Sequence, residues 1–102
     1  DLGIDVAAYC NGLAEAASEL RRQLLDRLRA GDLARAEQLM GAMDEVYSLL
    51  VTIDYPDGVT GGLRRTTDAL RAVLERTRGD LTTAMVAARL QSAIESARDA
   101  TR

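Results

Sequence analysis

Aliphatic residues recur along this chain at steps of three, four or seven, and this spacing constrains its fold more than any other feature. Such steps place side chains on one face of an α-helix, whereas a half-buried strand would need strict alternation. No segment of the sequence alternates in that way. The stripes are Val6, Leu13, Ala17, Leu20, Leu24 and Leu28; Ala36, Leu39, Met43, Val46 and Leu50; Leu63, Thr66, Leu70 and Leu74; and Val86, Leu90, Ala93, Ile94 and Ala97.

Three breaks divide these stripes. Gly31-Asp32-Leu33 and Gly79-Asp80-Leu81 each offer a glycine for a helix C-terminus and an aspartate for the next N-cap. The segment 54–62 contains Pro56 and three glycines, which favour a turn. Because the connections are short, neighbouring helices should be antiparallel. The sequence therefore predicts an all-α, antiparallel up-down bundle of about four helices, over residues 5–29, 33–53, 63–78 and 81–100.

The composition excludes many kinds of catalysis. The chain has 102 residues and no His, and all 13 basic residues are Arg. A Ser-His-Asp triad, a Schiff-base lysine and a Walker-type phosphate loop are therefore impossible. A single cysteine, Cys10, cannot form a disulfide framework or a zinc cage within one chain. Any chemistry must depend on carboxylates, in combination with a hard metal ion.

The sequence also indicates how the chain is organised and where it resides. We expect one helical domain over residues 1–102, because this length suits a single domain. Only 3% of residues are aromatic, and a first helix of about 25 residues is long for so small a domain, so we expect a homo-oligomer. No apolar run is long enough for a membrane span, and no signal peptide is visible. We therefore expect a cytoplasmic protein without membrane contact.

Two glutamates on the first predicted helix are candidate metal ligands. Glu15 and Glu19 lie one turn apart on the face opposite the leucine stripe, so both carboxylates could approach one divalent cation. Mg²⁺ takes one or two carboxylates together with water and phosphate oxygens, which makes it the expected ion. Metal-bound water is a competent nucleophile for phosphodiester cleavage. The alternative is a solvated helix face on which Glu19 forms only a surface ion pair with Arg22.

Arg64 and Arg65 are candidate nucleic-acid contacts. They follow Gly61-Gly62 at the predicted start of the third helix, where two guanidinium groups and helix amides could hold a phosphate. The alternative is that Asp68 and Glu75 neutralise the arginines of this helix. The net charge of −3 does not by itself indicate nucleic-acid binding.

The chain resembles the second half of translin-family proteins, in particular the prokaryotic members. The resemblance implies an all-α subunit of a ring- or barrel-like oligomer, typically an octamer, that binds single-stranded DNA and RNA. It also implies that this chain is the C-terminal part of a larger helical domain whose upstream helices are missing. The matching stretches cover most of residues 4–85 and include 5–15, 18–22, Gly31-Asp32, 43–47, Leu63-Arg64-Arg65 and the helix up to Gly79.

One branch of that family, the translin-associated factor X branch, adds Mg²⁺-dependent endoribonuclease activity. Its pair of acids four residues apart maps onto Glu15 and Glu19, although the family usually has Asp at the first position. Its second pair belongs to an upstream helix that this chain lacks. The resemblance therefore implies a single-stranded nucleic-acid-binding protein in which Glu15 and Glu19 act as catalytic metal ligands. The alternatives are a non-catalytic DNA- or RNA-binding protein and a helical interaction module.

Overall fold

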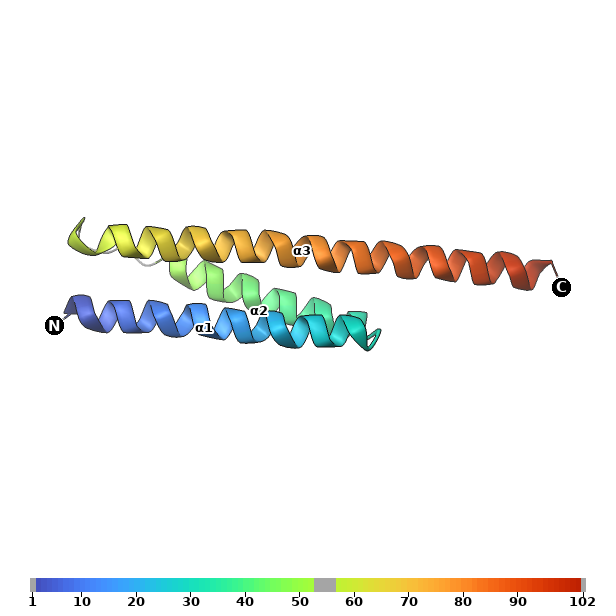
Figure 1. Cartoon of the computed structure of the whole chain (residues 1–102), viewed down its shortest axis with the longest axis horizontal. Helices are drawn as coiled ribbons and strands as arrows, with labels where there is room; N and C mark the ends of the chain where they lie inside the picture. The colour runs from blue at the N-terminus through green and yellow to red at the C-terminus, as the bar shows by residue number, and fades with distance from the viewer. Residues whose placement is uncertain (1, 53–56, 102) are drawn as a thin grey trace.

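The chain folds into three helices, and the computed structural model describes residues 2–52 and 57–101. The helices are α1 (Leu2–Arg29), α2 (Leu33–Thr52) and α3 (Asp57–Ala100). Helices α1 and α2 form an antiparallel hairpin that packs along the first part of α3, and the last part of α3 continues past the hairpin turn (Figure 1). The molecule measures 71 × 18 × 15 Å. The all-α class and the antiparallel arrangement are therefore confirmed.

The turn between α1 and α2 has the structure that its sequence predicts. Gly31 adopts a φ of 78°, the left-handed conformation that glycine favours. The amide of Asp32 donates to the Arg27 carbonyl at 2.9 Å, and that of Gly31 to the Leu28 carbonyl at 3.1 Å, which is a Schellman motif. Asp32 then caps α2, because its Oδ1 accepts from the Arg35 amide at 3.1 Å.

The second predicted break, at Gly79-Asp80, is wrong, because α3 runs through it without interruption. Gly31 is the only glycine with a positive φ in the part of the chain that the structure describes, so Gly79 keeps helical geometry. The four buried residues on this face of α3 continue the helical spacing across the glycine. A glycine inside a helix costs about 1 kcal/mol of stability relative to alanine. The free energy gained by burying the side chain of Leu81 exceeds this cost. The four buried residues are Leu70, Leu74, Thr77 and Leu81.

The core lies between the hairpin and α3, and it ends near Leu81. The stripes predicted for α1, α2 and the first half of α3 supply most of its side chains. The last stripe behaves differently: Val86, Leu90 and Ile94 are 56%, 61% and 50% exposed, so their predicted packing does not occur within one chain. The buried apolar residues are Cys10, Ala17, Leu24, Ala36, Leu39, Met40, Met43, Leu50, Leu70, Leu74 and Leu81.

Among the described residues, none of the helices has a segment long and apolar enough to cross a lipid bilayer. Tyr55 and Pro56, which formed part of the third predicted break, lie outside the described residues.

Candidate functional site

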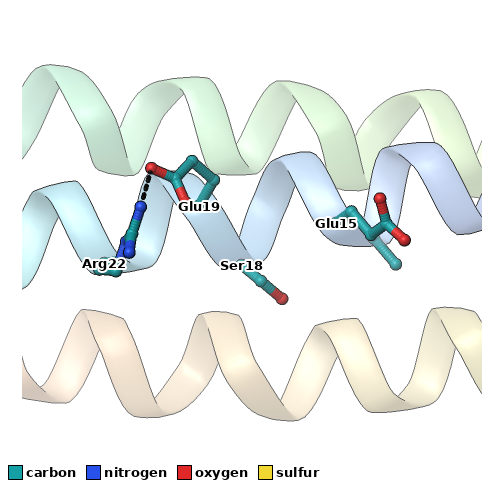
Figure 2. Close-up of a pocket in the computed structure, with 5 residues that line it drawn as sticks. Glu15, Ser18, Glu19 and Arg22 are labelled. Carbon is teal, nitrogen blue, oxygen red and sulfur yellow. Dashed lines mark hydrogen bonds and ion pairs between the residues drawn. The ribbon is translucent and has the colours of Figure 1, made fainter.

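Glu15 and Glu19 lie where the sequence predicts, one turn apart on the exposed face of α1. They border a shallow hollow of about 420 Å³, whose other lining residues come from the same helix (Figure 2). The stripe of apolar residues on the opposite face of α1 fixes this orientation, because Ala17 and Leu24 are fully buried in the core. The remaining lining residues are Ala14, Ser18 and Arg22.

Glu19 forms an ion pair with Arg22 on the same helix. Nη2 of Arg22 donates to Oε1 of Glu19 at 2.7 Å, and both side chains are at least half exposed. This hydrogen bond, together with the charge of Arg22, lowers the pKa of the Glu19 carboxyl below its ordinary value. Glu19 is therefore ionised at neutral pH, but one of its oxygens has a guanidinium partner. The alternative derived from the sequence, a surface ion pair, is present in the structure.

The two carboxylates do not converge on a common point. Figure 2 shows the Glu19 carboxylate turned toward Arg22 and away from Glu15. Within the described ranges, no group of three or more acidic or cysteine side chains is placed to hold a metal ion. Mg²⁺ accepts one or two protein carboxylates with water completing its shell, so both glutamates are ligands of the kind that this ion takes. In this structure, however, the contact with Arg22 holds the Glu19 carboxylate away from Glu15 (Figure 2).

Arg64 and Arg65 do not lie at the start of a helix, where the sequence predicts them. Because α3 begins at Asp57, these residues lie within the helix and not at its N-terminus, so their amides are not available to an anion. The predicted helix-terminus phosphate site is therefore wrong. Both side chains are exposed, and consecutive helical positions point about 100° apart. Any contact of theirs with phosphate must come from the side chains alone.

The structure also shows polar contacts between α2 and α3 that sequence analysis did not find. Nε of Arg71 donates to Oη of Tyr47 at 3.0 Å, and Nη2 of Arg78 donates to Oδ1 of Asp44 at 2.7 Å. A hollow of about 380 Å³ lies beside these four side chains, and Leu74 and Glu75 complete its lining. Arg71 and Tyr47 are 24 positions apart in sequence, and Arg78 and Asp44 are 34 apart. These contacts form only because α2 packs antiparallel to α3, so the sequence gives no local signal for them.

The chain is similar in sequence to an uncharacterized protein of Methanocaldococcus jannaschii. The two are 39% identical over 75 residues, which cover 74% of this chain and 33% of that protein. No protein-family model matches the chain.

Two solved structures of AfC3PO, a translin-family protein, resemble this chain in both sequence and structure. One is a complex with duplex RNA; its TM-score is 0.69, and that of the other is 0.68. In both cases the identity is 40%, and the match covers 79% of this chain and 43% of the AfC3PO chain. This chain thus spans less than half the length of either relative. At this level of identity and structural similarity, the chain is a translin-like protein.

Proposed function

We propose that this chain binds RNA as part of a translin-like protein. The observation that carries the proposal is its 40% identity to AfC3PO, which has a structure in complex with duplex RNA. The match covers 43% of the AfC3PO chain, so the proposal assigns to this chain one part of a larger RNA-binding surface. Both single-stranded and duplex RNA are candidate ligands, with single-stranded DNA as a third.

Because the chain is acidic overall, any RNA-binding surface must be a restricted area with its own basic side chains. The net charge is −3 and the isoelectric point is near 4.9, so the chain as a whole does not attract polyanions. Phosphate contacts must therefore come from individual arginines that point away from the core. Arg64 and Arg65 are both exposed on α3, and each is a candidate for such a contact.

A second candidate function, Mg²⁺-dependent endoribonuclease activity, is favoured by the exposed pair Glu15 and Glu19. Their carboxylate oxygens would bind the cation, and Glu19 would first have to release Arg22. When bound, Mg²⁺ supplies an activated water and charge stabilisation for phosphodiester hydrolysis. The remaining ligands would be water, RNA phosphate or carboxylates from elsewhere in the longer protein. The non-catalytic alternative is the same RNA-binding protein without this metal.

We also propose that the protein works as a homo-oligomer, with an octamer as the family's typical assembly. The support comes from the part of α3 that extends past the hairpin (Figure 1). The α3 side chains of Val86, Leu90 and Ile94 form a row of exposed aliphatic groups. Exposed apolar patches on soluble proteins commonly mark interaction surfaces.

Fluorescence anisotropy with labelled oligonucleotides tests the proposed RNA binding. The same sequence is presented as single-stranded RNA, duplex RNA and single-stranded DNA, at two salt concentrations. We expect RNA to bind and its affinity to fall as salt rises, because arginine–phosphate contacts release counterions. The absence of RNA binding at low salt would overturn the proposal. Incubation of labelled RNA with Mg²⁺ or with a chelator then separates the enzyme from the non-catalytic alternative.

A further inference from the structure

Arg71 is held in place by an uncharged partner. Its Nε donates to Oη of Tyr47 on the neighbouring helix at 3.0 Å. Arg22, Arg29 and Arg78 each donate to a carboxylate instead. Guanidinium has five N–H donors, so the Tyr47 contact leaves the four on Nη1 and Nη2 for a ligand. A guanidinium that is already oriented loses less conformational entropy when it binds a phosphate.

Arg78 lies two turns further along the same face of α3. A step of seven residues advances about 10.5 Å along a helix and rotates by only about 20°. Arg78 is in turn held by Asp44 of α2 at 2.7 Å. The 380 Å³ hollow lies beside both arginines, with Leu74 in its lining. Two guanidinium groups, each positioned by a side chain of α2, therefore border this hollow.

Two more exposed arginines extend this line in both directions. Arg64 precedes Arg71 by seven residues and Arg89 follows Arg78 by eleven, so all four fall within about 40° around the helix axis. We name Arg64, Arg71, Arg78 and Arg89 the arginine row. It spans roughly 37 Å along the helix axis.

The hollow beside Arg71 and Arg78 is also lined by two carboxylates, those of Asp44 and Glu75. Carboxylates repel phosphate but accept a hydrogen bond from a hydroxyl group, and the 2′-hydroxyl is what distinguishes RNA from DNA. The mixture of guanidinium and carboxylate groups therefore matches a ribose–phosphate backbone better than a deoxyribose one. An acidic protein segment would bind the arginines but meet repulsion from both carboxylates.

We propose that the arginine row, with Arg71 and Arg78 at its centre, contacts the phosphates of an RNA strand that lies along α3, and that Asp44 and Glu75 accept 2′-hydroxyl groups. This inference rests on the proposed function, RNA binding, and assigns a surface to it. No base is read by these contacts, so the row should bind different RNA sequences with similar affinity.

The test compares two double variants of the chain, each of which removes two positive charges from α3. R71A/R78A changes the row, whereas R76A/R98A changes exposed arginines that point about 140° and 180° away from Arg71. With labelled RNA, we expect R71A/R78A to weaken binding about tenfold or more and to lower the salt slope by about two. We expect R76A/R98A to stay within about twofold of the unchanged chain. Circular dichroism of each variant checks that the helices are intact.

Two further variants keep the inference testable if R71A/R78A loosens the packing of α2 on α3. Y47F keeps the charge of Arg71 but removes the oxygen that orients it, and should weaken RNA binding about two- to fivefold with an unchanged salt slope. E75A should reduce the ratio of RNA affinity to DNA affinity. An unchanged ratio would overturn the 2′-hydroxyl contact.

The outcomes separate this inference from the proposed function. If RNA binds the unchanged chain and both double variants lose affinity equally, the arginine row is overturned while RNA binding stands. If no RNA binds at all, the proposed function fails, and the row loses its ligand with it. A polyglutamate peptide that binds as tightly as RNA, and with the same sensitivity to R71A/R78A, would overturn RNA as the ligand in favour of an acidic protein.

Discussion

Arg21 of α1 reaches across the bundle to Thr77 of α3, and its Nη1 lies 2.5 Å from the threonine Oγ1. The same nitrogen lies 3.4 Å from Oδ2 of Asp80. Thr77 is completely buried and in turn donates to the Val73 carbonyl at 2.7 Å. This contact joins the first helix to the third at the level of Gly79, where the sequence predicts a break.

Replacing Arg21 should therefore destabilise the bundle. R21M keeps an unbranched apolar side chain and leaves the Thr77 hydroxyl bonded to Val73, so it removes mainly the charged contacts. We expect a loss of about 1–2 kcal/mol in the free energy of unfolding, measured by urea titration. R27M, at an exposed position of the same helix, should change stability by less than about 1 kcal/mol. Equal effects of the two substitutions would show that the Arg21 contact contributes nothing specific.

Substitution of two glycines by alanine distinguishes a continuous α3 from a broken one. Gly79 has helical geometry and open space where a Cβ would lie, so G79A should stabilise the chain by about 0.5–1 kcal/mol. Gly31 also has open space but a φ of 78°, so G31A should destabilise it by about 1 kcal/mol. Thermal unfolding of both variants provides the measurement. A destabilising G79A would mean that α3 breaks where the sequence predicts.

The fold illustrates which features a local pattern can establish. The hairpin turn was predictable because Gly31 and Asp32 satisfy the ends of two helices through nearby backbone and side-chain atoms. The same two residue types at Gly79 and Asp80 do not end a helix, because Leu81 must remain in register with Leu74 to be buried. That requirement comes from tertiary packing, which overrides the local preference of glycine.

For the candidate site, the sequence predicts which residues are exposed but not how their side chains are oriented. The exposure of Glu15 and Glu19 followed from the apolar stripe on the other side of α1, but the orientation of their carboxylates depends on Arg22. The Arg71–Tyr47 pair had no local sequence signal, since its members are 24 residues apart on different helices.

Glu19 should titrate differently once Arg22 is removed. Its pKa is lowered by the Arg22 hydrogen bond, so this contact stabilises the folded chain above the ordinary glutamate pKa of about 4.3 and is lost as pH falls through the lower folded value. In R22Q we expect the pKa of Glu19 to rise toward its ordinary value. Carboxyl carbon shifts followed by NMR give the pKa directly. An unchanged pKa in R22Q would show that Arg22 does not cause the shift.

The metal proposal makes a separate prediction that does not depend on activity. Titration with Mg²⁺ should shift the carboxyl signals of both Glu15 and Glu19, and R22Q should bind the ion more tightly because the competing guanidinium is gone. In E15Q the shift of the Glu19 carboxyl signal should be lost or much smaller, and in E19Q that of Glu15. A response of only one glutamate, or of neither, would contradict a shared Mg²⁺ site on this chain.

The proposed homo-oligomer should depend on the exposed apolar side chains of α3. L90E places a charge where the side chain is 61% exposed, so the fold of one chain should tolerate it while an assembly that buries this face should dissociate. S92E, about 200° around the same helix, is the control that should leave the assembly intact. Light scattering gives the mass of each species. An assembly unaffected by L90E would place the contact elsewhere.

Titration of a labelled RNA with this chain shows whether the chain binds RNA. Anisotropy of a labelled RNA, measured with increasing chain concentration at low and at physiological salt, should show saturable binding that weakens as salt rises. A flat titration at both salt concentrations, with the helices intact by circular dichroism, would contradict the claim that this translin-like chain binds RNA.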